Sequence, residues 1–354
     1  MKKLLSIACL ASMAIAITGC GGKPKVPENT VAAAYINVEK AYENIVDVAS
    51  AFIDIMPAKA KESAKQEFEM VQGQAKEFLD ELNPKWAVVS FGGEFDRLGG
   101  SPEECAAAVL KVDAKEEKLV AKIKELAAGM GAEGKDGVYR LNGAFVGNIG
   151  GDYVVVGASK ESFSEMFDLY SGKGKASGEF DGLSDLSGDT VARLATVPIS
   201  SLIERFELAR HIEKFGEECG DKELADMITG LGPISYDLTF GMDEIGASLN
   251  FGFRNAKDAE TFGHLLHSIA FLSRVGFDAS SYALGSKMLD SVRGNSFISD
   301  AMGPISKFSN AAGEVCKLYA KAVKAKCEGA TASLSCVFDT DEALKLVSKI
   351  GEEK

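Results

Sequence analysis

The feature that most limits the possible folds is a unit that recurs along the chain: an apolar strand, a polar residue suited to cap a helix, and an amphipathic helix. Ala247-Ser-Leu-Asn-Phe-Gly-Phe253 and Ala332-Ser-Leu-Ser-Cys-Val-Phe338 are near copies, and each precedes a helical pattern. Thr190-Val191-Ala192 likewise repeats Thr30-Val31-Ala32 at the start of an apolar strand. This recurrence predicts an internally duplicated α+β fold, in which antiparallel sheets are covered on one face by amphipathic helices.

Residues 171–189 separate the two copies in this interpretation. They are polar and rich in Gly and Ser, and no apolar period survives in them. The cluster Gly172-Lys-Gly-Lys-Ala-Ser-Gly178 lacks the Gly-Lys-Ser/Thr ending of a phosphate-binding loop, which favours a flexible linker. We therefore expect a first α+β repeat at 30–170 and a second at 190–354.

Long helical patterns predict a broken helical hairpin in each repeat. In the first repeat a helical stripe from Glu39 to Leu82 is interrupted at Pro57. In the second, a helix capped by Asn255 runs to Leu272, and the stretch from Tyr282 to Lys326 is helical with a break at Gly303-Pro304. The residues Ile199–Phe215 predict one further helix. Apolar stripes of this kind are more often core faces than binding grooves.

The amino terminus has the pattern of a secretory signal. Met1-Lys2-Lys3 is cationic, Leu4–Ile17 is apolar and too short for a stable membrane span, and small residues precede a cysteine. The four residues Ile17-Thr18-Gly19-Cys20 resemble the lipobox of bacterial lipoproteins. An ordinary cleaved signal with an incidental cysteine is the alternative.

The lipoprotein resemblance implies that residues 1–19 are removed and that Cys20 becomes a lipidated amino terminus. Two or more acyl chains make anchoring stable, so the partner implied is the membrane, reached through the acyl chains on Cys20. Residues 20–29 would then form a polar tether. Gly21 stands where Asp would act as an inner-membrane retention signal, which favours the outer membrane. Pro27–Val38 and the duplicated layout also resemble envelope proteins of unassigned function, a resemblance that carries no catalytic residues.

Charge excludes one class of partner. The full chain has a net charge of -13, and the loss of Lys2 and Lys3 with the signal makes the mature chain -15. Phosphate binding depends on clustered Lys and Arg, so this acidic chain without a basic cluster predicts no nucleic-acid partner. It also argues against flat adhesion to anionic lipid.

Five cysteines remain after Cys9 leaves with the signal and Cys20 is lipidated, and an odd number cannot all pair within one chain. They are Cys105, Cys219, Cys316, Cys327 and Cys336. If Cys316 and Cys327 lie on one helix, they are about 16 Å apart along its axis and cannot bridge each other. No zinc spacing occurs, so buried small apolar residues are the favoured interpretation.

Candidate chemistry is sparse. His264 and His267 are one turn apart on a predicted helix, a spacing that can hold a metal, but no third ligand follows and packing histidines are the simpler interpretation. His211 is isolated. No Gly-x-Ser-x-Gly elbow or Ser-x-x-Lys pattern is present. We therefore expect no catalytic, cofactor-binding or metal-binding residues, and no cofactor.

These observations predict a non-enzymatic, lipid-anchored cell-envelope protein with a binding or accessory role toward a protein or an apolar ligand. The alternative is an envelope hydrolase whose site is assembled from scattered residues. A cleft between the halves would be the expected ligand site. Its candidate lining residues are Phe262, Phe271, Phe277, Phe297 and Phe308.

Overall fold

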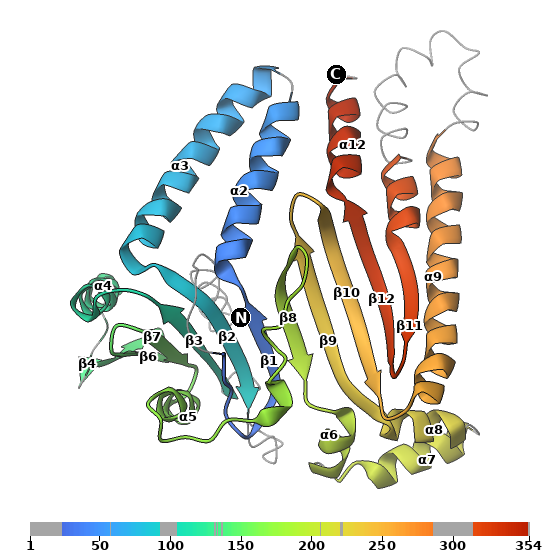
Figure 1. Cartoon of the computed structure of the whole chain (residues 1–354), viewed down its shortest axis with the longest axis horizontal. Coiled ribbons are helices and arrows are strands. Elements are labelled where there is room, and N and C mark those ends of the chain that lie inside the picture. The colour runs from blue at the N-terminus through green and yellow to red at the C-terminus, as the bar shows by residue number, and fades with distance from the viewer. Residues whose placement is uncertain are drawn as a thin grey trace. The chain divides into compact units, whose positions relative to one another are not determined.

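The structure is a computed structural model, shown in Figure 1. It describes residues 23–56, 58–92, 105–130, 132, 134–135, 137–205, 207–219, 222–285 and 314–352. The expected signal peptide, the lipobox with Cys20, the Gly303-Pro304 break, and both Phe297 and Phe308 lie outside these residues. The chain divides into two compact units. Unit 1 comprises the residues up to Ile45 together with Glu69–Asp237, and unit 2 comprises Val46–Phe68 and Leu238–Lys354.

Unit 1 is built on an antiparallel sheet with the strand order β8-β1-β2-β3-β7-β6-β5-β4. Its strands are β1 (Thr30–Ile36), β2 (Pro84–Gly92), β3 (Ala106–Val112), β4 (Gly134–Lys135), β5 (Val138–Leu141), β6 (Ala144–Ile149), β7 (Tyr153–Gly157) and β8 (Thr190–Thr196). The helices that precede β8 in the chain are α2 (Val38–Ile55), α3 (Ala58–Leu82), α4 (Glu116–Gly129) and α5 (Lys160–Tyr170). The expected break at Pro57 is confirmed, because α2 ends at Ile55 and α3 begins at Ala58.

Helices cover both faces of the unit 1 sheet, whereas the sequence predicted one covered face. Neighbouring residues of a strand point to opposite faces. One face packs against α5 in a cluster that contains Val88, Val109, Val155, Phe163 and Met166. The other face packs against α4 in a cluster that contains Val112, Leu119, Ile123, Ala127 and Val146. Strands with apolar residues on both faces, such as β2 and β3, meet the requirement for a sheet buried on two sides.

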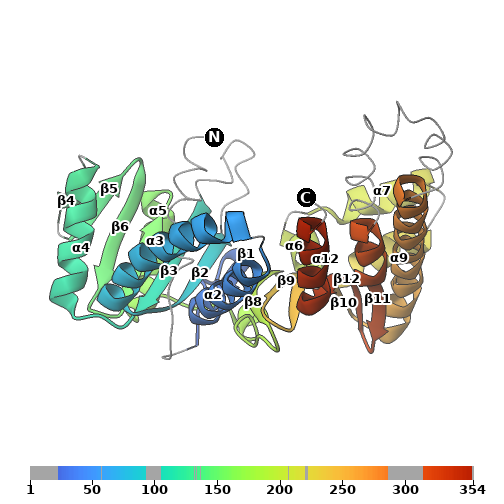
Figure 2. The same ribbon diagram turned by 90° about the horizontal axis from the view of Figure 1, so that it is seen from above.

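Unit 2 contains three neighbouring antiparallel strands in the order β11-β12-β10 and a long helix beside them. Its elements are β10 (Glu244–Phe253), α9 (Ala256–Gly285), β11 (Val323–Glu328), β12 (Thr331–Asp339) and α12 (Thr340–Glu352). As predicted, Asn255 caps α9: its side chain accepts a hydrogen bond from the Asp258 amide at 2.9 Å. The two views agree that α9 lies alongside β11 (Figures 1 and 2).

Three short helices and one strand complete the chain between β8 and β10. They are α6 (Ile199–Arg205), α7 (Ala209–Cys219), α8 (Lys222–Thr229) and β9 (Leu231–Phe240). The single helix predicted over 199–215 is therefore wrong in its extent. Two helices form there instead, and Glu207 between them has a positive φ of 51°, a conformation that a continuing α-helix does not allow.

The internal duplication is confirmed by the order of the elements. In the first repeat, β1 is followed by the helices α2 and α3, then by β2, β3 and α4, and the repeat ends with β6, β7 and α5. In the second, β8 is followed by the helices α6, α7 and α8, then by β9, β10 and α9, and the repeat ends with β11, β12 and α12. The strand pairing agrees, because β7 lies between β3 and β6 as β12 lies between β10 and β11. The strands β4 and β5 belong to the first repeat alone among the described residues.

The opening strands of the two repeats pair with each other around a local two-fold axis. If Thr30-Val31-Ala32 is aligned with Thr190-Val191-Ala192, Ala34 corresponds to Leu194. In the antiparallel β1·β8 ladder, Ala34 lies directly opposite Leu194. Each strand thus offers the same edge to the other, which is the geometry of an isologous interface.

The segment 171–189 packs into unit 1, although the sequence predicted a linker at a domain boundary there. Phe180 and Leu183 are buried in the same cluster as Val88. The Ser177 amide donates to the Val26 carbonyl at 2.9 Å. Phe180, Leu183 and the half-buried Leu186 supply the packing, and three apolar residues in a polar segment are too few to define a helix or a strand.

Two smaller expectations are corrected as well. Residues 323–328 form a strand instead of the end of a helix, so Cys316, in the helix at 314–322, and Cys327, in β11, belong to different elements. Val323, Ala325 and Cys327 alternate with Lys324, Lys326 and Glu328, which is the period of a strand. The spacing of Asp113 and Glu116 predicts a helix capped at Asp113, but α4 begins at Glu116 with Lys115 as its N-cap, and no side-chain hydrogen bond caps it.

Candidate functional site

The structure places the sequence-predicted site residues apart from one another. His264 and His267 lie one turn apart on α9, as expected, and both are exposed to solvent. His211 is exposed on α7. Within the described residues, no group of three or more His, Cys, Asp or Glu side chains could hold a metal ion. The thiols of Cys316, Cys327 and Cys336 are half-buried and form no disulfide in that part of the chain.

The phenylalanines proposed to line a cleft have different environments. Phe262 packs against Phe251 and Phe253 with ring centroids 4.8 and 5.4 Å away, so this half-buried side chain faces its own sheet. Phe277 contacts Tyr319 at 5.4 Å. Phe271, in contrast, is 63% exposed. The described members of the set therefore do not form one site.

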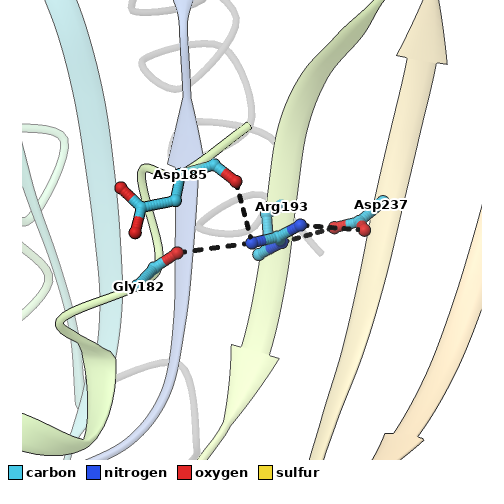
Figure 3. Close-up of polar contacts among 4 residues, drawn as sticks. All are labelled: Gly182, Asp185, Arg193 and Asp237. Atoms are coloured by element: carbon cyan, nitrogen blue, oxygen red, sulfur yellow. Dashed lines mark hydrogen bonds and ion pairs between the residues drawn. The ribbon is translucent and has the colours of Figure 1, made fainter. Parts of the chain in front are cut away.

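A polar cluster joins β8, β9 and the packed segment 171–189 of unit 1 (Figure 3). The Arg193 guanidinium is bound bidentately by Asp237, with Nε to Oδ1 at 2.6 Å and a second N–H to Oδ2 at 3.1 Å. A third donor reaches the carbonyl oxygens of Gly182 and Asp185, both at 3.3 Å. The side chains of Arg193 and Asp237 are only 24% and 15% exposed.

This arrangement favours a structural role for Arg193. A planar guanidinium with two carboxylate contacts and two carbonyl contacts has its charge matched and its donors directed at the protein. The cluster fixes residues 182–185 against β8. A reaction on a substrate would require a side chain of the cluster to contact that substrate. The hydrogen bonds described above already engage the Arg193 guanidinium and the Asp237 carboxylate with the protein.

A second polar group lies within the aromatic core of unit 1. Lys111 is buried, with Nζ 2.6 Å from Asp152 Oδ1 and 4.7 Å from the centroid of the Tyr153 ring. Trp86, Tyr153 and Tyr170 pack around one another with centroids 4.8 to 6.3 Å apart. A paired cation on an aromatic face is a stable way to bury a lysine, so this cluster also has a structural explanation.

The side of α9 that faces its own sheet combines small residues with Phe262 and Leu266. Ala259, Gly263 and Ala270 are buried there, together with Leu266. A methyl group added at Gly263 would lie 3.1 Å from the Cys327 Cβ. Small side chains let the helix axis approach β11 closely, and this inner face leaves little room for larger residues.

The opposite side of α9 carries the large apolar residues. We call it the outer face of α9 and define it by Leu265, Ser268, Ile269, Phe271, Leu272 and Val275. The apolar members are between 41% and 67% exposed, with Leu272 the most exposed. Full burial of such a side chain contributes about 1.5–3 kcal/mol, so the described chain leaves a substantial stabilisation unused at this face.

Carboxylates and lysine are absent from the outer face, although the exposed His264 lies on the same side of the helix, four residues before Ser268. Residues 261–276 contain no aspartate, glutamate or lysine in a chain with 52 acidic residues. Their one arginine, Arg274, donates from Nε to the Val323 carbonyl at 2.7 Å and so binds the strand beside the helix. A contiguous apolar and uncharged surface on a folded domain is characteristic of an interaction site.

The first repeat provides an internal comparison for this helix. α4 follows β3 as α9 follows β10, and it buries Leu119, Ile123 and Ala127. Its exposed positions include Glu116, Glu117, Lys118, Lys124 and Glu125. The fold therefore accepts a charged outer face at this position, so folding alone does not require the apolar one on α9.

Within the described residues, none of the helices has the length and apolar character needed to cross a membrane, and α9 is included in that finding.

Comparisons with known proteins give little functional information. No protein family matches the sequence, and no curated protein matches it. The solved structure of crystal form I of TP0453 is similar with a TM-score of 0.38 and 10% identity, over 93% of this chain and 100% of that chain. Crystal form III of TP0453 has a TM-score of 0.39 and 12% identity, over 95% and 97% of the two chains. At such TM-scores the likeness says nothing about function or ligand.

The apolar residues of the outer face of α9 were visible in the sequence, but their pattern favoured a role in core packing. Apolar residues lie on both the inner and the outer side of this helix, and apolar stripes were interpreted as core faces, although Phe271 was also a candidate for the lining of a cleft. Which side is buried depends on where the small residues lie relative to β11. That relation exists only in the folded chain.

Proposed function

We propose that this protein is a lipid-anchored component of the bacterial cell envelope with a non-enzymatic binding or accessory role. The anchor is Cys20 in the lipobox Ile17–Cys20, and the binding surface is the outer face of α9. The outer membrane is the proposed location, since Gly21 follows the lipidated cysteine. The partner is apolar at the point of contact.

The observation that carries the binding role is the set of large apolar side chains on the outer face of α9. They are exposed although the other side of the helix packs on the sheet, whereas the equivalent helix α4 has charges outward. A partner that buries Phe271 and Leu272 recovers the stabilisation that the described chain leaves unused.

The anchor is tested by the intact mass of the protein from its own membrane. We expect a chain that begins at Cys20 and carries diacylglyceryl and acyl groups. In a Cys20→Ala variant both the added mass and the membrane association should disappear. An unlipidated chain that begins elsewhere would contradict the anchored role.

The binding surface is tested by a photo-crosslinking amino acid placed at Phe271 of the full chain in its native envelope. The control carries the same group at Glu117, which is exposed on α4. We expect an adduct from position 271 and none from position 117. Equal yields at both positions, or no adduct from either, would argue against a specific binding face on α9.

A further inference from the structure

We propose that the occupant of the outer face of α9 is a second copy of this chain, with the two α9 helices packed antiparallel around a two-fold axis at the level of Ala270. This inference rests on the proposed binding role of that face and specifies its partner. A two-fold interface uses the same patch on both copies, so the patch must complement itself.

The positions on the outer face are symmetric about Ala270. Leu265 and Val275 lie five residues on either side, Ser268 and Leu272 lie two, and Ile269 and Phe271 lie one. Ala270 itself is buried on the opposite side of the helix. When a copy is turned end for end about this level, every position on the face meets another position on the face.

The pairing also matches small residues with large ones. Leu265 and Leu272 are a heptad apart, and Ser268 and Val275 occupy the positions three residues after each. In an antiparallel pair these layers alternate, so Ser268 lies opposite Leu272 of the partner subunit, and Leu265 lies opposite Val275 of the partner subunit. A small residue facing a large one allows interdigitation at close helix spacing.

The bulkiest side chains flank this seam on either side. Ile269 is adjacent to Ile269 of the partner subunit on one flank, and Phe271 is adjacent to Phe271 of the partner subunit on the other. Both residues are exposed in the single chain, at 41% and 63%. The flanks thus add an aromatic and an aliphatic contact that cover the seam from solvent.

Electrostatics favour self-association at this face over other parts of the surface. Two copies of a mature chain with net charge -15 repel each other, and like charges placed close together oppose docking. Residues 261–276 carry no carboxylate, so the repulsion is weakest there. A face without charge needs no charge complement and can meet its own copy.

The test is sedimentation equilibrium of the chain Gly21–Lys354 and of two single variants with the same added charge. Leu272→Glu puts a carboxylate into the proposed seam, and Ala128→Glu puts one on the exposed side of α4. Both sites are exposed, so both variants should fold. We expect the parent and Ala128→Glu to be dimers and Leu272→Glu to bind its copy on the order of 100-fold more weakly.

Each result decides between the hypotheses. A parent chain that stays monomeric, or a Leu272→Glu variant that dimerises as well as the parent, overturns the inference. Crosslinking from position 271 in the native envelope then separates the two proposals. An adduct of twice the chain mass supports the second copy, whereas an adduct with a different protein leaves the binding role intact and overturns the dimer. No adduct at all overturns both.

Discussion

Among single residues, Arg193 shows how the second repeat has departed from the first. In the alignment of the opening strands it corresponds to Ala33, which is fully buried in the core of unit 1. The larger, charged side chain is accepted because Asp237 and two carbonyl oxygens surround it. Such a pair is costly to break on one side only, since the remaining charge is then left partly buried.

We predict that Arg193→Met lowers the free energy of unfolding by about 2 kcal/mol, after a discount for the partial exposure of the pair. Urea denaturation of the variant measures this loss. Adding Asp237→Leu should restore part of it, because the second change removes the unmatched carboxylate. A loss below about 0.5 kcal/mol would mean that the cluster does not secure the segment at 182–185.

The buried phenol of Tyr170 makes the stability of the fold depend on pH. Its hydroxyl donates to the Lys25 carbonyl and accepts from the Lys25 amide, both at 2.9 Å. Burial of the phenol raises its pKa above the ordinary value of about 10. The folded state therefore keeps this proton at a pH where the unfolded state has lost it.

We predict that the free energy of unfolding falls as the pH rises above about 10, because the unfolded chain then binds fewer protons than the folded one. Tyr170→Phe should cost about 1 kcal/mol at neutral pH and should flatten part of the alkaline decline. Denaturation curves over a range of pH measure both effects. An alkaline decline of the same steepness in the variant would assign the effect to other groups.

Among the elements, two glycines show when a helix depends on the absence of a side chain. The docking of α5 on β7 depends on a residue without a side chain. At Gly157 an added methyl group would overlap the backbone of Phe163, the fourth residue of α5. Gly73, in contrast, lies on α3 with open space around it. Packing therefore requires glycine at position 157, whereas at position 73 only the helix propensity of the residue matters.

We predict that Gly157→Ala destabilises the protein by at least about 2 kcal/mol, since α5 must move off the sheet to admit the methyl group. Gly73→Ala should be neutral or stabilising by up to about 1 kcal/mol, because alanine favours a helix over glycine. Thermal and urea unfolding of the two variants provide the comparison. Similar effects at both sites would contradict the close approach of α5 and β7.

For the molecule as a whole, the segment 171–189 decides how the repeats are organised. A linker between independent domains would have few buried contacts. This one buries Phe180 and Leu183 in the core of unit 1 and is held by Arg193. The division into units consequently does not follow the division into repeats, since residues beyond the segment, up to Asp237, belong to unit 1.

We predict that Phe180→Ala costs about 3–5 kcal/mol, which is the range for a buried phenylalanine. A side chain in a flexible linker would cost well under about 1 kcal/mol. Urea unfolding followed by circular dichroism distinguishes these results. Lys175→Ala, at an exposed position of the same segment, is the control and should have little effect.

Local patterns in the sequence determined the elements and the duplication. The cap at Asn255, the helix break at Pro57 and the near copies at 247–253 and 332–338 could be identified because each depends on neighbouring residues. In the structure those two copies pair, with Leu249 opposite Leu334. The strand at 323–328 was missed because its Lys and Ala residues also suit a helix.

Tertiary structure alone decided what is buried. Residues 171–189 have no period, and only the folded sheet offers Phe180 a place in the core. The helix α9 carries large apolar residues on both its inner and its outer side, so its sequence could not indicate which side meets β11. The small residues at Gly263 and Ala270 settle that choice through close packing, and the choice leaves Phe271 and Leu272 outside. Burial is a relation between distant segments, so the binding surface emerges only from the fold.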